Sequence, residues 1–220
     1  KTGEWWSTNP ERALANNSVA YTEKPDPGIF MKEWLSLYES KSGERGIFSR
    51  ASAQKKAAEN GRRESNWDFG TNPCSEIILR PNQFCNLTEI VVRAGDTVNT
   101  LTRKIKVATL LGTIQSTFTN FGYLRKVWQD NTEEERLLGV SLTGIMDSEL
   151  LNGKESGLAK TLEKLKKVAV DCNKEYAEKF NINQSTAITC VKPSGTVSQL
   201  VDSASGIHAR HNPYYIRTVR

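Results

Sequence analysis

The sequence predicts an α/β fold in which the strands are mainly parallel. Amphipathic helical segments alternate with strand segments, and the strand segments are continuous apolar runs of the kind buried on both faces of a sheet. The helical segments span 96–122 and 156–180, and the main strand segments span 84–92, 138–143 and 186–191. Because the 220 residues contain no repeat, low-complexity tract or linker, we treat 1–220 as one unit.

The first predicted helix begins at Asp26 and Pro27, an N-cap followed by proline at the first helical position. Its apolar residues recur at helical spacing until Gly43, and they are Phe30, Met31, Trp34, Leu35 and Tyr38. The segment before Asp26 predicts no clear element. The elements that follow are a strand at 47–48, an Ala- and Lys-rich helix at 51–59 closed by Asn60-Gly61, and an extended segment at 76–79.

The later elements have separate signals. Asp96 is the predicted cap of a long helix that keeps one apolar face and ends near Asn120. Thr132-x-x-Glu135 has the spacing of a capping box, which predicts a short helix starting there. In 156–180 the apolar residues alternate steps of four and three, which predicts another amphipathic helix. The last strand, 186–191, leads into a Gly-containing turn and a short helical run.

Composition excludes several classes of protein. The chain has 30 Lys and Arg and 25 Asp and Glu, which gives a net charge of +5. The basic residues are spread along the chain instead of forming a stripe, so we expect no nucleic-acid partner. There is no long apolar run and no signal peptide, which indicates a soluble, cytoplasmic protein without a membrane partner. The four cysteines are far apart and form no Cys-x-x-Cys pair, so we expect reduced thiols. The chain begins with Lys1 instead of Met, which suggests a piece of a longer protein.

The segment Asn72-Pro73-Cys74-Ser75-Glu76 brings an amide, a thiol and a carboxylate to alternating positions. Since Pro73 favours extended backbone before it, we expect Asn72, Cys74 and Glu76 to line one small site. The alternative is a turn with a buried cysteine and a surface glutamate. Cys85 follows eleven residues later, and a strand-turn-strand path would bring it back near Cys74. Two thiols beside a carboxylate favour redox or radical chemistry over hydrolysis.

A second candidate site is the turn Pro193-Ser194-Gly195-Thr196, between a strand and a short helix. Backbone N–H groups, two hydroxyls and a helix dipole suit a phosphate, although an ordinary capped loop would have the same residues. It is not a Walker loop. Cys172 lies on the apolar face of a helix and Cys190 ends a strand, so both are expected to be structural. His208 and His211 have no evident third ligand, and no metal site is expected.

Together the motifs resemble the catalytic chain of ribonucleotide reductase, more narrowly the adenosylcobalamin-dependent class II enzymes that reduce ribonucleoside triphosphates as monomers. The resemblance rests on three ordered motifs, Asn72-x-Cys74-x-Glu76 with Cys85, then Gly139-Val140-Ser141-Leu142-Thr143-Gly144, then Val191-Lys192-Pro193-Ser194-Gly195-Thr196-Val197. It implies a ten-stranded α/β barrel with a central finger loop that carries the radical cysteine.

The resemblance also implies roles for residues. Cys74 would become the thiyl radical that removes the substrate 3′ hydrogen, Glu76 the base for the 3′ hydroxyl, and Asn72 a partner of the substrate hydroxyls. Cys85 would be one thiol of the reducing pair. The residues implied to hold the substrate phosphates are Ser194, Gly195, Thr196 and Val197. The implied cofactor is adenosylcobalamin, and the implied partners are a ribonucleotide substrate, deoxyribonucleotide effectors and a thioredoxin-like reductant.

The chain also departs from that family. The second reducing thiol and the C-terminal cysteine pair have no counterpart, so we expect residues 1–220 to be a central part that cannot turn over alone. Two other functions stay open. One is a class I reductase large-subunit fragment, for which Tyr214-Tyr215 would be the tyrosine pair. The other is a non-catalytic module that binds nucleotides or nucleic acid.

Overall fold

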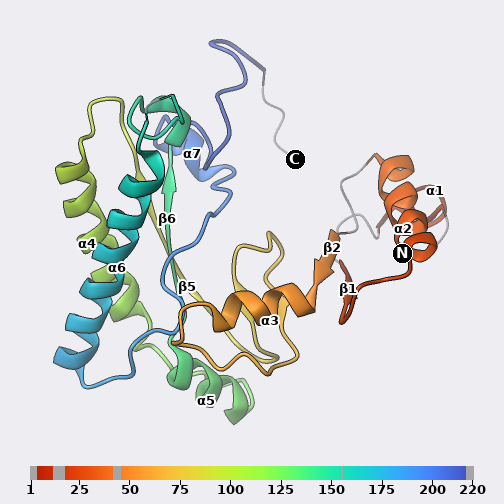
Figure 1. Ribbon diagram of the computed structural model, residues 1–220, viewed down its shortest axis with the longest axis horizontal. Helices are drawn as coiled ribbons and strands as arrows, with labels where there is room; N and C mark the ends of the chain where they lie inside the picture. Colours follow the sequence, from red (N-terminus) through yellow and green to blue (C-terminus); the bar gives the residue numbers. More distant parts are fainter. Residues whose placement is uncertain (1–3, 12–17, 42–45, 155, 217–220) are drawn as a thin grey trace. The chain divides into compact units, whose positions relative to one another are not determined.

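The computed structural model describes residues 4–11, 18–41, 46–154 and 156–216. The chain divides into two compact units, Lys1–Pro81 and Asn82–Arg220, which we call the N-terminal and C-terminal units. Figure 1 traces both along the sequence. No helix in the described ranges combines the length and apolar character needed to cross a membrane.

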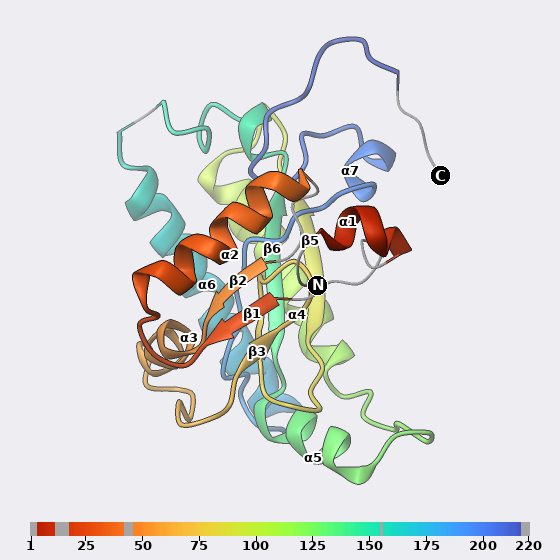
Figure 2. The same ribbon diagram turned by 90° about the vertical axis from the view of Figure 1, so that its right-hand side faces the viewer.

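The N-terminal unit carries two small sheets. Strands β1 and β2 are parallel and lie side by side in Figure 2, and β3 and β4 form an antiparallel hairpin. A small core of Ala53, Ala57 and Phe69 fills the space beside the hairpin. The elements in order are α1 (Trp5–Thr8), β1 (Ser18–Tyr21), α2 (Pro27–Ser40), β2 (Gly46–Ser49), α3 (Arg50–Ala58), β3 (Gly70–Thr71) and β4 (Ile78–Leu79).

The predicted helix start at Asp26 is confirmed. The Asp26 carboxylate accepts hydrogen bonds from the backbone N–H groups of Gly28 and Ile29, at 2.9 and 3.1 Å, as an N-cap does. The helix extends to Ser40, and Gly43, the predicted end, lies outside the described residues. Sequence reasoning missed α1 and β1, which precede Asp26.

The C-terminal unit is a parallel sheet with helices on one face (Figure 1). Strands β5 and β6 pair in register from Asn86 opposite Leu138 to Val91 opposite Thr143. Helices α4 and α6 pack against each other and bury a core that includes Leu101, Leu138 and Leu165. The elements are β5 (Asn86–Val91), α4 (Val98–Gln115), α5 (Lys126–Glu135), β6 (Leu138–Thr143), the 3-10 helix η2 (Ile145–Asp147), α6 (Leu158–Phe180) and α7 (Val197–Leu200).

The predicted strand 186–191 does not form as a regular strand, although its backbone lies beside β6 and bonds to it irregularly. Its only bridge within the described residues is the parallel one between Thr189 and Val140. Backbone bonds run from Leu138 N–H to Ala187 C=O at 2.9 Å and from Val140 N–H to Ile188 C=O at 2.8 Å. The two donors are two residues apart in β6, but their acceptors are only one residue apart. The pairing therefore shifts by one residue between Leu138 and Val140, as it does at a β-bulge. The described residues form no closed barrel.

The predicted helix start at Thr132 is wrong. Helix α5 begins at Lys126, and Thr132 lies in its last turn, where its hydroxyl donates to the Trp128 carbonyl at 2.7 Å. A Thr three residues before Glu fits either end of a helix, since a threonine hydroxyl can also bond back to the preceding turn. The cap of α4 is Thr97, one residue after the predicted Asp96, and that helix ends at Gln115 instead of near Asn120.

Candidate active site

The first candidate site is the tip of the β3–β4 hairpin. The last strand pair is Thr71 with Ile78, so residues 72–77 form the loop. The Ser75 N–H donates to the Asn72 carbonyl at 2.9 Å, and Ser75 has a φ of +61°. The expectation of extended backbone is therefore wrong here. Proline fixes φ near −65°, which suits the second position of a tight turn, so Pro73 bends the chain.

The side chains at the tip differ in exposure. Cys74 is exposed, so the alternative of a buried cysteine is wrong, while Asn72 and Glu76 are half-buried. The Asn72 side-chain oxygen accepts from the Ile77 N–H at 3.1 Å, which holds the amide across the loop. An accessible thiol between a fixed amide and a carboxylate is suited to one-electron or proton chemistry on a small substrate. Whether the three side chains line one site stays a prediction.

Arginines brace the base of the hairpin. Arg63 donates to the Ile78 carbonyl at 2.8 Å and lies over the Phe69 ring, 4.7 Å from its centroid. Arg50 donates to the Phe69 carbonyl at 2.9 Å. Guanidinium groups that stack and donate at once hold a backbone in place more firmly than a lysine would. The tip therefore projects from a fixed base.

Cys85 belongs to the other unit, immediately before β5. It is half-buried and lines a cavity of about 530 Å³ that is rich in aromatic residues. The Phe84 ring lies 5.1 Å from the Phe121 ring and 4.7 Å from the Trp128 ring, measured between centroids. Since Cys74 and Cys85 are in different units, their proximity stays a prediction.

The second candidate site, the 194–197 loop, is built around a buried hydroxyl. Ser194 is 9% exposed, and its Oγ lies 2.8 Å from Thr143 Oγ1 and 3.0 Å from Ser205 Oγ. The Gly206 N–H donates to both Ser194 Oγ, at 3.1 Å, and Thr143 Oγ1, at 2.9 Å. The Ser194 hydroxyl is thus engaged inside the protein. Thr143, Ser205 and Gly206 were not singled out from the sequence as members of this site.

The rest of the loop faces solvent. Gly195, Thr196 and Val197 are exposed, and Gly195 has a φ of +53°, a conformation that favours glycine. The Gly195 N–H donates to Ser205 Oγ at 3.1 Å, and the Val197 N–H donates to the Ser194 carbonyl at 3.2 Å. The exposed part of the loop is therefore residues 195–197, while the Ser194 hydroxyl is held inside the protein.

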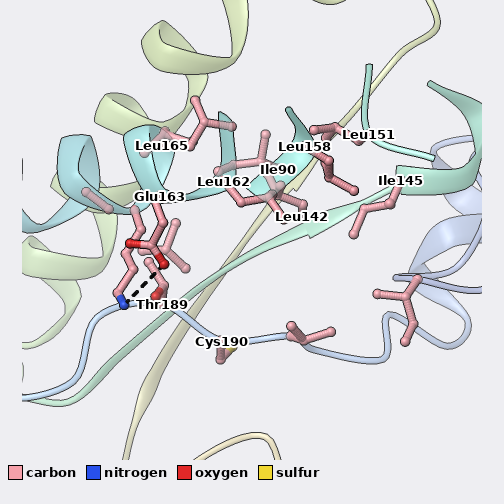
Figure 3. Close-up of a pocket in the computed structure, with 16 residues that line it drawn as sticks. Ile90, Leu142, Ile145, Leu151, Leu158, Leu162, Glu163, Leu165, Thr189 and Cys190 are labelled. Atoms are coloured by element: carbon pink, nitrogen blue, oxygen red, sulfur yellow. Dashed lines mark ion pairs between the residues drawn. The ribbon is translucent and has the colours of Figure 1, made fainter. Parts of the chain in front are cut away.

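The two histidines lie beside the 194–197 loop: the His208 N–H donates to the Ser205 carbonyl at 2.8 Å, and His211 lines one cavity with Gly195. Cys172 is buried and donates to the Lys106 carbonyl at 3.5 Å, and burial, with the nearby Glu175, raises the pKa of its thiol. Cys190 lines an apolar cavity of about 480 Å³ beneath α6 (Figure 3). In the described part of the chain, no three His, Cys, Asp or Glu side chains gather as metal ligands.

One carboxylate on the sheet is perturbed. Glu89 lies in β5 opposite Ser141, and burial raises its pKa against the opposing attraction of Lys192. Its Oε1 is buried and has no hydrogen-bond partner among the described residues. Nothing in the sequence distinguishes this glutamate from a surface one, because its environment comes from the neighbouring loop.

Comparisons with known proteins point to one group. The adenosylcobalamin-dependent ribonucleoside-triphosphate reductase of Lactobacillus gasseri is 30% identical, over 69% of this chain and 23% of its own length. The enzyme of the same name from Lacticaseibacillus paracasei is 28% identical, over 95% of this chain and 31% of its own. The chain thus spans less than a third of these relatives. No family model matches it.

A solved structure has the same fold. The B12-dependent (class II) ribonucleotide reductase superposes with a TM-score of 0.57 and 22% identity, covering 87% of this chain and 34% of that one. The helices and strands of this chain are therefore arranged as in part of the ribonucleotide reductase fold. The chain is homologous to the adenosylcobalamin-dependent ribonucleoside-triphosphate reductases, which confirms the resemblance that its motifs predicted.

Proposed function

We propose that residues 1–220 are the central part of an enzyme that reduces ribonucleoside triphosphates to 2′-deoxyribonucleotides by a thiyl radical. The observation that carries the proposal is the exposed Cys74 thiol at the tip of a braced hairpin, between Asn72 and Glu76. The homology to adenosylcobalamin-dependent reductases supports it. We assign the hairpin to the tip of the finger loop of a ten-stranded barrel, of which this chain supplies a part.

The tip has the chemistry that the cofactor requires. A hydrogen atom can leave only a thiol that another molecule can reach, and Cys74 is exposed where Cys172 is buried. When bound, adenosylcobalamin supplies the oxidising equivalent that converts such a thiol to a thiyl radical.

Each side chain at the tip has its own role in the reaction of the substrate. The Cys74 sulfur takes the 3′ hydrogen atom and returns it at the end of the cycle. Glu76 accepts the proton of the 3′ hydroxyl, and the Asn72 side-chain NH₂ donates to a substrate hydroxyl, since its oxygen is held by Ile77. The 2′ hydroxyl leaves as water, and two thiols supply the two electrons as they form a disulfide. Cys85 is one of them.

The remaining partners follow from the same chemistry. The loop with Ser194, Gly195, Thr196 and Val197 takes the substrate triphosphate. A thioredoxin-like dithiol restores the reducing pair, and deoxyribonucleotides act as effectors through regions beyond this chain. Cys74 and Cys172 are free thiols, which fits a reducing compartment, and we place the enzyme in the cytoplasm.

The test is electron paramagnetic resonance on the full-length protein with adenosylcobalamin, a ribonucleoside triphosphate and a dithiol. We expect a cobalt-coupled thiyl signal that disappears in Cys74→Ala. Cys172→Ala is the matched control, because its sulfur is buried on α6, and it should keep the signal. A signal that persists in Cys74→Ala would refute the assignment.

A second experiment tests the proposal that the chain is one part of a larger site. The purified 220-residue chain, given the same cofactor and dithiol, should form no deoxyribonucleotide, because it has only one thiol of the reducing pair. Turnover by this chain alone would show that the missing thiol is not required.

A further inference from the structure

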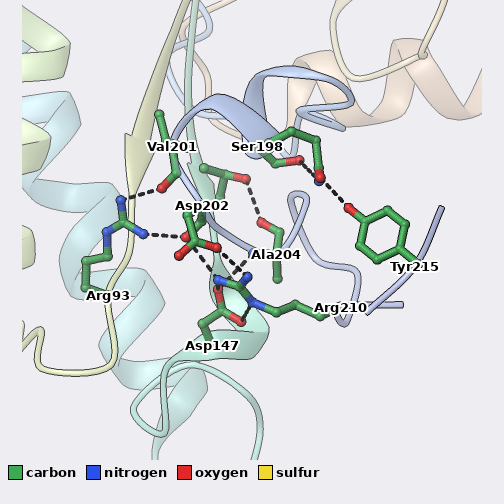
Figure 4. Close-up of polar contacts among 10 residues, drawn as sticks. Arg93, Asp147, Ser198, Val201, Asp202, Ala204, Arg210 and Tyr215 are labelled. Carbon is green, nitrogen blue, oxygen red and sulfur yellow. Dashed lines mark hydrogen bonds and ion pairs between the residues drawn. The ribbon is translucent and has the colours of Figure 1, made fainter. Parts of the chain in front are cut away.

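Arg210 joins three segments at one end of the C-terminal unit. Its guanidinium donates twice to the Asp147 carboxylate, with both N···O distances 3.0 Å. It also donates to the Asp202 carboxylate at 2.6 Å and to the Asp202 carbonyl at 3.0 Å. Figure 4 shows Arg210 held between the two aspartates, with Arg93 reaching Val201 and Asp202 from the other side.

The electrostatics agree with this geometry. Burial alone would raise the pKa of Asp147, but the hydrogen bonds from Arg210 and from the Ala204 N–H lower it below its usual value. The hydrogen bonds to Asp147 and Asp202 raise the pKa of Arg210. Both groups are therefore fully ionised at neutral pH, and the pair is bidentate and charge-assisted.

A chain of hydrogen bonds links Arg210 to the 194–197 loop. The Asp147 carboxylate accepts from the Ala204 N–H at 2.8 Å, and the Ala204 carbonyl accepts from Thr143 Oγ1 at 3.1 Å. Thr143 Oγ1 lies 2.8 Å from Ser194 Oγ. Arg210 thus holds the segment 202–206, and Ser205 and Gly206 of that segment hydrogen-bond to the Ser194 hydroxyl.

We propose that Arg210 is a positioning residue for substrate binding: through Asp147 and the segment 202–206 it holds the 194–197 loop in the conformation that receives the triphosphate. The inference rests on the proposed function for its consequence, although the structural coupling stands without it. Lysine cannot replace Arg210, because it has no planar fork for a carboxylate and reaches a single point.

The first test measures the coupling in the 220-residue chain without any substrate. Hydrogen exchange of the Gly206 amide reports the bond to Thr143 and Ser194. We expect Arg210→Lys to speed that exchange about tenfold, as expected when a charge-assisted bond is lost. The matched control is Arg136→Lys, whose guanidinium donates to the Ser116 carbonyl at 2.6 Å, outside this network. It should leave the Gly206 amide unchanged.

Asp147→Asn separates a specific coupling from general loosening. It should speed Gly206 exchange as Arg210→Lys does, and the double variant should be no faster than either single one, because both changes break the same pair. Unchanged exchange in Arg210→Lys, or additive effects, would overturn the coupling. Far-ultraviolet circular dichroism of each variant verifies that α4 and α6 remain folded.

The second test measures KM and kcat of the full-length protein with CTP as substrate. Arg210→Lys should raise KM for CTP by about five- to tenfold with kcat and the Cys74 radical signal nearly unchanged, since an exposed pair is partly screened. A fall in kcat at constant KM would refute the positioning role. If the wild type forms no deoxycytidine triphosphate at all while Gly206 exchange responds as expected, the proposed function fails and the coupling stands.

Discussion

Gly144, which follows β6, allows the sharpest test of the packing. It has a φ of +79°, and a Cβ there would lie 2.6 Å from the Val92 carbonyl oxygen. Val92 is fully buried and its N–H donates to the Thr143 carbonyl at 2.8 Å, so neither backbone segment can move aside freely. Gly153 is a matched control, because its φ is +85° and a Cβ there would meet nothing within 4 Å.

The expected magnitudes follow from separating the two effects. Both Gly144→Ala and Gly153→Ala place an L side chain in the left-handed region, at a cost of about 1–2 kcal/mol. Gly144→Ala also forces a methyl group against backbone, which adds roughly 1–3 kcal/mol in a packed interior. We therefore expect Gly144→Ala to lower the free energy of unfolding by about 1–3 kcal/mol more than its control does.

Urea unfolding followed by far-ultraviolet circular dichroism measures this difference, because α4 and α6 dominate the signal of the C-terminal unit. With a denaturant slope of about 2 kcal/mol per molar, the midpoint for Gly144→Ala should lie roughly 0.5–1.5 M below that for Gly153→Ala. Equal midpoints would refute the reasoning, since they would mean that Val92 yields to the methyl group at no cost.

Three further outcomes are expected. Cys74→Ser should abolish formation of deoxyribonucleotide in the full-length protein without changing its thermal unfolding temperature, because the side chain is exposed. Glu89→Gln should have a larger free energy of unfolding than wild type at neutral pH, because it removes the cost of burying a charged carboxylate. This difference in stability should shrink as pH falls through the raised folded pKa toward the ordinary value of 4.5, because protonation removes the same cost from wild type. A difference that does not depend on pH would contradict this. Asn173→Ala should lower the free energy of unfolding by about 2–4 kcal/mol, since Asn173 bonds to Thr113 and Ser185 in the core, whereas Lys174→Ala, on the exposed face of α6, should change it little.

Periodicity predicted the main helices and strands well, because burial on one face depends on local spacing. Helix α6 and strand β6 have the predicted bounds to within two residues. Strand β5 has the predicted place, but most of its residues are half-buried, not buried on both faces. Periodicity could not find β1, whose pairing with β2 depends on a partner 28 residues later in the register, Ser18 with Gly46.

The candidate site was predicted less completely. Motif spacing selected Cys74 and the 194–197 loop as candidates, yet it could not show that Pro73 and Ser75 bend the tip into a turn. The residues that hold the loop, Thr143 and Arg210, lie far from Ser194 along the chain, and only folding brings their hydrogen bonds together. A polar residue that acts through tertiary contacts has no local pattern.

The position of this network follows from the topology of the sheet. Arg93 follows β5, Asp147 follows β6, and Ser194 follows the irregular segment whose Thr189 bridges β6 in parallel, so all three come after the carboxyl ends of neighbouring parallel segments. Parallel α/β sheets bind their ligands at that edge, because the loops there meet while the helices occupy the face. The strand order therefore places the proposed phosphate loop and its positioning residues at one edge of the sheet. Few hydrogen bonds separate Arg210 from Ser194, so a substitution at Arg210 should affect Ser194.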